Sequence, residues 1–365
     1  MRILHTEASK GWGGQEIRIL DEAAGFIARG HDVHVAAPGD APIIAAAAAR
    51  GIPSHAIPVD RKSARSLRAL ARTISEFKPN IIVTHSSSDS WLAGAFHRLV
   101  HRRPAIVRLR HISAPVARGL QNRWLYGRVP KRVVTTGEAI RTMLIERLKL
   151  DPAHVVSIPT GTDLARFRPG DKNAARTALG LPADKPIIGI VATLRSWKGH
   201  RFLISAMNDP RLADARLVIV GDGPQDENLK QQIGALGLQE RVLLAGRHDN
   251  VVPWLQAFDV FALPSTGNEG VPQALMQAMA CGLPVVTTGA GAIPELAQDE
   301  ETALIVPAES SKMLAAAIDR LLGDGELGRK LGRAARAKVE KSYSRDGMLD
   351  AMAEVFRKAA IARSR

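Results

Sequence analysis

The stretch PIIGIVATL at residues 186–194 opens a second series of strand-like segments in this 365-residue chain. It is a short apolar run with β-branched residues, which is the composition of a buried strand. Helical stretches separate such runs, as at residues 15–29, where apolar positions recur at helical spacing and Gly30 marks the end. Strand–helix alternation predicts parallel sheets covered on both faces, and two successive series predict two doubly wound α/β domains. The runs lie at residues 1–8, 32–38, 80–87, 105–110 and 132–137 in the first series and at residues 186–194, 215–223, 241–246, 260–265, 284–291 and 303–307 in the second.

The length of the chain also favours two domains, because 365 residues exceed what one hydrophobic core usually serves. The joint is expected near residues 167–186, where proline, glycine and charge interrupt the periodicity. We place the domains at residues 1–168 and 169–342, and expect residues 343–365 to form a final amphipathic helix with basic ends. Ligands of such folds bind beyond the carboxyl ends of the strands, so the cleft between the domains is the expected site.

The composition is that of an ordinary soluble globular protein, with 45% apolar and 24% charged residues. Cys281 is the only cysteine, which excludes a disulfide framework within the chain and any multi-cysteine zinc site. No apolar run is long enough to cross a bilayer, and the first residues lack the pattern of a secretory signal. A cytoplasmic location is therefore expected.

The formal charge of +14 is concentrated in the first half of the chain. Residues 1–170 contain 26 basic and 13 acidic residues, whereas the remainder contains 24 and 23, and residues 98–132 hold ten basic residues and no acidic one. Such an asymmetry predicts a partner of opposite sign, either an anionic membrane surface or a phosphorylated substrate, or else a solvated basic face without a partner. Nucleic acid is disfavoured, because Trp124 and Tyr126 are the only stacking aromatics there and no binding motif is present.

The first loop with a chemical signal is GWGGQE at residues 11–16, which follows the first strand and opens the first helix. Gly13 and Gly14 would let backbone N–H groups approach an anion at the helix N-terminus. The loop does not match the dinucleotide fingerprint, because Glu16 stands where the last glycine is required. A glycine-rich turn without a ligand is an equally good interpretation.

Two further loops follow strands of the second series. In VATLRSWKG at residues 191–199, Arg195 and Lys198 are placed to hold a diphosphate, one as a planar fork and the other as a point charge. The alternative is a solvated loop that merely starts a helix. In NEGVPQALMQAMACGLPVV at residues 268–286, Glu269 stands beside the amides of Gly270 and Val271, which suits a sugar joined to a phosphate. Gln277 lies eight residues beyond Glu269, a little over two helical turns, and is expected to face the same side.

Together these motifs resemble those of the retaining glycosyltransferases of family 4, the group 1 transferases, which have the GT-B fold of two Rossmann-like domains. The matching pieces span nearly the whole chain in family order, and the last is the most specific. They are the Gly-Gly loop, HSSSDSWLAG at 85–94, His111, IPTGTDLARFRP at 158–169, LRSWKG at 194–199, VGDGP at 220–224 and EGVPQALMQAMACGLPVV at 269–286.

The resemblance implies a nucleotide-diphosphate sugar bound mainly by the C-terminal domain and an acceptor bound by the N-terminal domain. Arg195 and Lys198 would bind the diphosphate and neutralise the charge of the leaving nucleotide, and Glu269 would hold the sugar hydroxyls. His111 would contact the sugar near the reacting carbon. Transfer would retain the anomeric configuration, and the final helix would cross back onto the first domain.

The resemblance also gives the donor class and the expected cofactors. No cofactor is expected, and a UDP-sugar is favoured as co-substrate over a GDP- or ADP-sugar. No Asp-x-Asp motif is present, so a metal-free site is expected in which Arg195, Lys198 and helix N-termini replace a cation. His97 and His101 have i,i+4 spacing, but their basic neighbours would repel a metal, and we interpret them as surface residues.

The chain departs from the family at Gln277, where a second glutamate is usual and typically meets the ribose of the nucleotide. Glutamine keeps a carbonyl acceptor but replaces the charge by an amide donor, so activity is expected to survive. On the acceptor side, the candidates are His85, Asp89, Arg108 and Arg110. His85 and Asp89 either line the acceptor site or cap the following helix.

The basic N-terminal domain suggests a lipid-linked, phosphorylated glycan as the acceptor, met at the inner face of the cytoplasmic membrane, such as a lipopolysaccharide core or another envelope glycan. Three alternatives stay open. A sugar-nucleotide epimerase of the same architecture would convert the donor without an acceptor, a non-catalytic nucleotide-sugar-binding protein would bind without turnover, and a nucleic-acid binder would show a steep salt dependence. The oligomeric state has no signature in the sequence.

Overall fold

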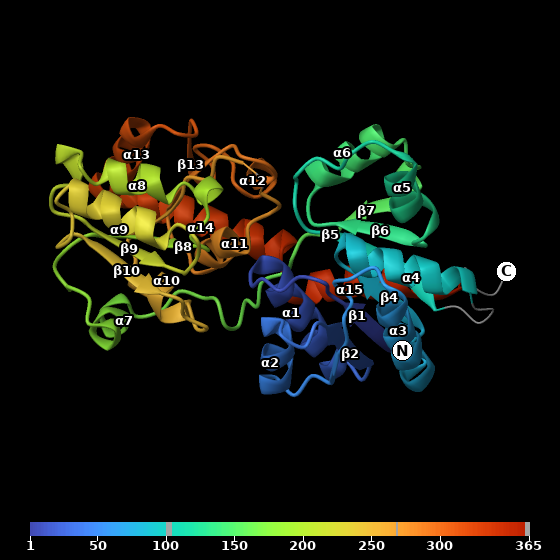
Figure 1. Ribbon diagram of the computed structural model, residues 1–365. Coiled ribbons are helices and arrows are strands. Elements are labelled where there is room, and N and C mark those ends of the chain that lie inside the picture. Colours follow the sequence, from blue (N-terminus) through green and yellow to red (C-terminus); the bar gives the residue numbers. More distant parts are fainter. Residues whose placement is uncertain (100–103, 268, 362–365) are drawn as a thin grey trace. The chain divides into compact units, whose positions relative to one another are not determined.

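The computed structural model describes residues 1–99, 104–267 and 269–361 of the chain. They form two compact units (Figure 1). The N-terminal unit comprises Met1–Thr160 and the C-terminal residues from Asp346 onward, and the C-terminal unit comprises Gly161–Arg345.

The N-terminal unit is built on a seven-stranded sheet in the order β3-β2-β1-β4-β5-β6-β7, and all its strand pairs are parallel. Hydrophobic clusters lie on both faces of this sheet, as burial on two sides requires. Its strands are β1 (Arg2–Thr6), β2 (Asp32–Ala37), β3 (Ser54–Ala56), β4 (Ile81–Thr84), β5 (Ala105–Arg110), β6 (Arg132–Thr135) and β7 (Val155–Ser157). Its helices are α1 (Gly14–Ala28), α2 (Pro42–Ala49), α3 (Ala64–Phe77), α4 (Ser87–Leu99), α5 (Leu120–Arg123), η1 (Trp124–Arg128), α6 (Glu138–Leu148), η2 (Pro152–His154) and α15 (Arg345–Ile361).

The C-terminal unit has a six-stranded parallel sheet in the order β10-β9-β8-β11-β12-β13, with one continuous hydrophobic core. Its strands are β8 (Ile187–Val191), β9 (Arg216–Val220), β10 (Val242–Gly246), β11 (Val260–Leu263), β12 (Val285–Thr288) and β13 (Leu304–Val306). Its helices are α7 (Lys172–Leu179), η3 (Ser196–Lys198), α8 (His200–Ala206), η4 (Pro210–Leu212), α9 (Asp226–Ala235), α10 (Val252–Ala257), α11 (Gln273–Ala280), α12 (Ile293–Leu296), α13 (Ser311–Gly323) and α14 (Gly325–Ser342).

Two doubly wound α/β units are therefore present, as the alternating pattern predicts. Every strand-like run of the sequence contains a strand, and the helix expected at residues 15–29 is α1. Strands β3 and β7 were not predicted, because they have three residues each and are too short to show an alternation.

The segment expected to be the joint, residues 167–186, instead lies within the C-terminal unit, since the chain passes between the units at Thr160 and Gly161. This segment contains α7, whose Arg176 is buried. The Arg176 guanidinium contacts Asp259 at 2.5 Å and donates a hydrogen bond of 3.0 Å to the carbonyl of Ala257. Proline and glycine mark the ends of this helix rather than a linker between domains.

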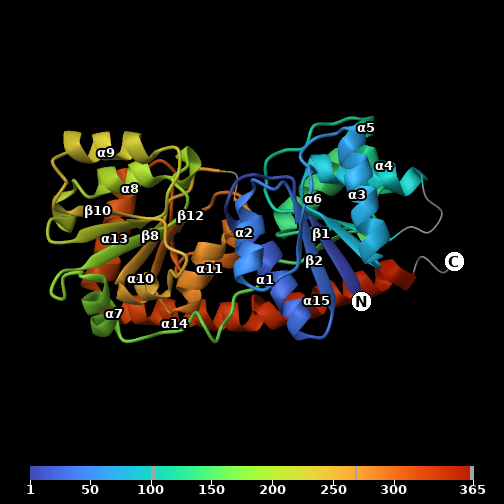
Figure 2. The ribbon, with the colours of Figure 1, turned by 60° about the horizontal axis from the view of Figure 1, so that its bottom comes forward.

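Helix α15 packs against α1 of the N-terminal unit (Figure 2). Leu349 fills the space above Gly25, and Phe356 lies 5.4 Å from Phe26 between ring centroids. Arg29 forms ion pairs with Asp346 and Asp350 of this helix at 3.2 Å and 2.7 Å. None of the described helices combines the length and apolar character needed to cross a bilayer.

Candidate functional site

The carboxyl end of β8 carries the two cations that the sequence assigns to a diphosphate. Residues 192–199 follow this strand, and Ser196–Lys198 form the single turn η3. Gly199 ends the turn with a positive φ of 76°, and a Cβ atom there would lie 1.9 Å from the carbonyl oxygen of Pro264. The loop is thus packed against the segment that follows β11, the neighbour of β8 in the sheet.

Lys198 and Glu269 form an ion pair at this junction. Nζ of Lys198 lies 2.7 Å and 2.9 Å from the two carboxylate oxygens of Glu269. The hydroxyl of Ser265 donates a hydrogen bond of 2.6 Å to the same carboxylate, and Glu269 is only 4% exposed. A carboxylate held by an ammonium and a hydroxyl has a fixed orientation. The structure therefore brings together a residue predicted to bind phosphate and one predicted to bind sugar.

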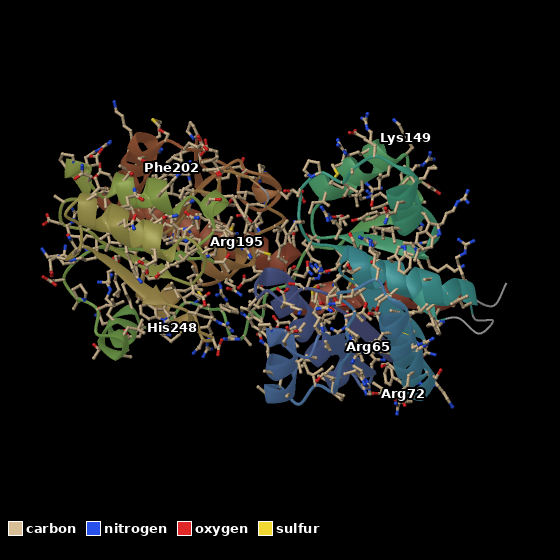
Figure 3. The ribbon with its side chains drawn as sticks, viewed as in Figure 1. Arg65, Arg72, Lys149, Arg195, Phe202 and His248 are labelled. Atoms are coloured by element: carbon tan, nitrogen blue, oxygen red, sulfur yellow. The ribbon has the colours of Figure 1, made fainter. Side chains whose placement is uncertain are left out.

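Arg195 lies in the same loop in a more open environment. Its side chain is exposed and is labelled in Figure 3. The guanidinium lies over the ring of Trp197, 5.2 Å from the centroid. This stacking limits the motion of the side chain while its planar fork stays open to an anion from solvent.

The backbone of Glu269 is supported from another loop. The amide of Ala292 donates a hydrogen bond of 3.1 Å to the Glu269 carbonyl. A Cβ atom at Gly291, whose φ is +59°, would lie 2.2 Å from that carbonyl oxygen. Only glycine permits this approach, so the position of the carboxylate depends on the loop after β12.

The residues that follow Glu269 lead into α11. Gly270 is partly exposed and Val271 is buried, and the helix begins at Gln273. Pro272 is the N-cap of this helix. Gln277 is half-buried on α11. Donor binding by Gly270, Val271 and Gln277 stays a prediction.

In the N-terminal unit, three histidines form a hydrogen-bonded chain. His5 lies within β1, His85 follows β4 and His111 follows β5. Nδ1 of His5 lies 3.1 Å from Nε2 of His85, and Nδ1 of His85 lies 2.9 Å from Nε2 of His111. His5 and His85 are buried, whereas His111 is partly exposed. The structure thus brings His85 and His111 together and adds His5, which the sequence analysis missed.

A signal for His5 exists in the strand register. His5 pairs with Val83 of β4, which pairs with Val107 of β5. Side chains two residues apart in a strand share a face, so His85 and His111 lie two and four residues beyond these partners on the same side. The strand order that makes this visible is not encoded in any single run.

Asp89 lies in the first turn of α4, and its carboxylate binds backbone amides at the start of this helix and just before it. Its carboxylate accepts hydrogen bonds from the Thr6 hydroxyl at 2.9 Å and from the backbone amides of His85, Ser86 and Ser90 at 2.8, 2.9 and 2.8 Å. Burial raises the pKa of Asp89 to about 6. The capping role left open by the sequence is present, while contact of His85 or Asp89 with an acceptor stays a prediction.

Glu7 is a buried acid at the end of β1 that the sequence analysis missed. It accepts hydrogen bonds from the Ser9 amide at 2.6 Å and the Ser86 hydroxyl at 2.7 Å, and also from the Gln15 side chain. Burial, and then the nearby charge of Asp89, raises the pKa of Glu7 to about 7. Its position at the carboxyl end of a parallel strand was the available signal.

Gly13 and Gly14 lie at the start of α1, with Gly13 as the N-cap. They belong to the N-terminal unit, whereas the other residues assigned to the donor belong to the C-terminal unit. Their contact with a donor stays a prediction.

The two arginines assigned to the acceptor have different environments. Arg108 is 1% exposed, stacks on Tyr126 at 4.0 Å and donates a hydrogen bond of 3.1 Å to its hydroxyl. Arg110 is partly exposed and donates a hydrogen bond of 2.6 Å to the carbonyl of Ala114. Arg108 thus has a packing role inside the unit, and acceptor binding by either residue stays a prediction.

Within the described residues, no group of three or more His, Cys, Asp or Glu side chains is arranged to hold a metal ion. His97 is partly exposed on α4. His101, paired with it in the sequence analysis, and the neighbouring Arg102 and Arg103 lie outside the described residues.

Comparison with known proteins gives the family of this chain. The model described as "Glycosyl transferases group 1" matches residues 171–338, and "Glycosyltransferase Family 4" matches residues 12–166. The chain belongs to the family 4, or group 1, glycosyltransferases, as its motifs predict. It is similar to the D-inositol 3-phosphate glycosyltransferase of Saccharomonospora viridis, with 31% identity over 244 residues, which is 63% of this chain and 56% of the relative. The chain spans about half the length of the curated relatives it matches.

Solved structures of similar proteins show the same fold. A glycosyltransferase from Rickettsia africae matches with a TM-score of 0.88 and 20% identity, over 98% of both chains. Anabaena HepE in complex with UDP matches with a TM-score of 0.86 and 23% identity, over 98% of this chain and 100% of that one. The fold is therefore GT-B, with two Rossmann-like units, as the resemblance implies.

Proposed function

We propose that this chain is a retaining glycosyltransferase that moves a sugar from a nucleotide-diphosphate sugar to a hydroxyl acceptor. The observation that carries this proposal is the Lys198–Glu269 pair, held by Ser265 beside the exposed Arg195. Cations suit a diphosphate, and a fixed carboxylate accepts hydrogen bonds from sugar hydroxyls. Family membership supports the same reaction class.

The two cations have different parts in this proposal. Arg195, which is exposed, binds the diphosphate as it enters, and Lys198 joins it from the ion pair with Glu269. The ammonium is then shared between carboxylate and phosphate, so it is already in place when negative charge grows on the leaving group. Charge stabilisation by preorganised groups of this kind needs no metal ion.

The proposed chemistry is a displacement at the anomeric carbon that retains its configuration. The acceptor oxygen bonds to the anomeric carbon on the face from which the diphosphate leaves, and a phosphate oxygen takes the acceptor proton. The bond between the anomeric carbon and the phosphate oxygen breaks, and the nucleoside diphosphate departs with its electron pair. His111 contacts the sugar near the reacting carbon, and no cofactor takes part.

A UDP-sugar is the favoured donor, because the structurally similar HepE binds UDP; GDP- and ADP-sugars are alternatives. The favoured acceptor is anionic, since the relative from Saccharomonospora viridis is named for a phosphorylated inositol. The excess of basic residues in the first half of the chain suits such an acceptor. A phosphorylated, lipid-linked envelope glycan, such as a lipopolysaccharide core, combines these features.

A panel of UDP-, GDP- and ADP-sugars tests the donor by thermal unfolding. A ligand at 100 times its dissociation constant stabilises the folded state by about 2.7 kcal/mol. We expect stabilisation by one nucleotide class and transfer to a glycan acceptor in product analysis. Conversion of the donor without an acceptor would point to an epimerase, and binding without turnover to a non-catalytic binding protein.

Peripheral contact with the inner face of the cytoplasmic membrane is part of this proposal. Leu120 is 84% exposed at the start of α5, between the exposed Arg118 and Arg123. An apolar side chain flanked by cations suits an anionic bilayer surface. Exposed arginines also lie along α3, among them Arg65 and Arg72 (Figure 3).

Sedimentation with anionic liposomes tests this contact. We expect binding at low salt, and about a tenfold or greater loss in the Arg118→Ser/Arg123→Ser variant, because each cation near the surface contributes about 1 kcal/mol. The matched control is Arg211→Ser/Arg320→Ser, whose arginines pair with carboxylates of the C-terminal unit. Absence of binding by the wild type, or equal loss in both variants, would contradict membrane contact through α5.

A further inference from the structure

In the histidine chain of the N-terminal unit, formed by His5, His85 and His111, the position of the proton on each ring depends on its position on the neighbouring ring. The rings of His5 and His85 are stacked with centroids 5.4 Å apart, and those of His85 and His111 are stacked at 5.2 Å. Each neighbouring pair is joined by one nitrogen–nitrogen hydrogen bond, of 3.1 Å and 2.9 Å. Each of these bonds needs one N–H group and one lone pair.

A neutral imidazole has a single N–H, so only two arrangements satisfy both bonds. If His85 carries its proton on Nδ1, it donates to His111, and His5 must donate to His85 from Nδ1. Nδ1 of His111 is then an N–H donor. If His85 carries its proton on Nε2, all three rings are protonated on Nε2, and Nδ1 of His111 is an acceptor. The three tautomers therefore change together.

The inner end of the chain faces a buried acid. Nε2 of His5 lies 3.9 Å from a carboxyl oxygen of Glu22 on α1, and both residues are 0% exposed. Within the described residues, neither oxygen of Glu22 nor Nε2 of His5 has a hydrogen-bond partner. Ionised Glu22 attracts an N–H on Nε2 of His5, whereas protonated Glu22 presents its O–H to a lone pair at that atom.

We propose that Glu22, acting through His5 and His85, determines whether Nδ1 of His111 is a hydrogen-bond donor or an acceptor. When Glu22 is ionised, Nδ1 of His111 is an acceptor, and when Glu22 is protonated, Nδ1 is a donor. Glu22, His5 and His85 are thus positioning residues for His111. This role rests on the proposed transferase function, in which His111 contacts the sugar.

Burial and the surrounding charges keep the three histidines neutral, whereas Glu22 at the inner end of the histidine chain titrates near neutral pH. Burial, then the Arg18 charge, lowers the pKa of His5 to about 3, and burial holds the pKa values of His85 and His111 well below their usual range. Burial raises the pKa of Glu22 to about 7, against the opposing effect of Arg18. Nδ1 of His111 is therefore a donor below about pH 7 and an acceptor above it.

The charged groups around these three histidines come from three elements, α1, β5 and α4. Arg18 shares α1 with Glu22, and its Nε lies 3.6 Å from the Glu22 carboxyl. Arg108 and Arg110 on β5 disfavour protonation of His85 and His111, respectively. Asp89 on α4 accepts from the backbone amide of His85 rather than from its ring. The ring nitrogens between Glu22 and His111 therefore bond only to one another among the described residues.

Nitrogen-15 NMR of the full chain tests the relay without any substrate. In the wild type, we expect the N–H of His111 to move from Nδ1 to Nε2 as the pH rises through about 7. In Glu22→Gln, we expect a single tautomer across this range. The internal control is the His34–His55 pair, hydrogen-bonded at 2.8 Å elsewhere in the unit, whose signals should respond equally in both proteins.

A second variant covers the case in which Glu22→Gln does not fold because Arg18 loses its partner. His85→Phe keeps a ring in the stack but removes both hydrogen bonds, so His111 should lose its pH response. A His111 tautomer that is constant in the wild type would overturn the proposal. So would a response that persists in Glu22→Gln or, where that variant is unfolded, in His85→Phe.

The kinetic consequence separates this inference from the proposed function. We expect the pH profile of kcat/KM to show an inflection of about 2- to 10-fold near pH 7 that is absent from Glu22→Gln. A tautomer switch without any sugar transfer would refute the transferase function but not the relay. Transfer with no tautomer switch would refute the relay alone.

Discussion

Glu269→Ala lowers the turnover of sugar transfer well over tenfold in the mechanism proposed here. The substitution removes the carboxylate that accepts hydrogen bonds from Lys198 and Ser265. The Lys198 ammonium then loses its fixed position, and the sugar loses its acceptor group. Loss of one preorganised group in such sites typically costs about 10²- to 10³-fold in kcat. Steady-state kinetics with the donor identified by thermal unfolding measures this loss.

Gln277→Glu is the contrasting variant in the same segment. It restores the charge usual in the family, on a half-buried position of α11. Since a ribose diol binds to an amide or a carboxylate, we expect the Michaelis constant for the donor to change less than tenfold. Glu269→Gln, which keeps one oxygen for Lys198, should fall between the two. A large effect at Gln277 and a small one at Glu269 would overturn the assigned roles.

Gly199→Ala destabilises the C-terminal unit by about 2–5 kcal/mol, the sum of the costs of a left-handed backbone and of overpacking. Its φ is +76°, and the new Cβ would lie 1.9 Å from the carbonyl oxygen of Pro264. Because this contact joins the loop of Lys198 to the segment of Glu269, we also expect loss of donor binding. Urea unfolding of the full chain, followed by a probe in this unit, measures the stability.

Gly237→Ala is the matched control for this effect. Its φ of +64° is also left-handed, but nothing lies within 4 Å of the added Cβ. It should cost only about 1–2 kcal/mol and leave donor binding intact. Equal losses of stability in the two variants would show that the close approach of Gly199 to Pro264 does not affect the free energy of unfolding.

The sequence predicts the sheets of this protein well and its site only in part. Long apolar runs between helices identify the strands, because burial on both faces leaves few polar residues in them. The same runs do not give the order of the strands. Lys198 and Glu269 are 71 residues apart and meet because β11 lies beside β8, so the ion pair emerges only from the topology.

The N-terminal unit shows the same limit. His5 and His85 lie in two separate strand-like runs and His111 directly follows a third, and these runs become neighbours in the order β1-β4-β5. Glu7 directly follows a strand. Its local sequence does not predict its three hydrogen-bond partners or its raised pKa. Local patterns therefore predict which loops matter, whereas pairings across the sheet decide what those loops do.

The most direct test of the account is titration calorimetry of the nucleotide sugar with the wild type and with Arg195→Met/Lys198→Met. Charge-assisted hydrogen bonds contribute about 1.5–3 kcal/mol each, so we predict at least about a 100-fold loss of affinity in the double variant. Lys230→Met, an exposed lysine paired with Asp226 and Glu227, should bind like the wild type. Unchanged affinity in the double variant would contradict the claim that these two cations hold the diphosphate.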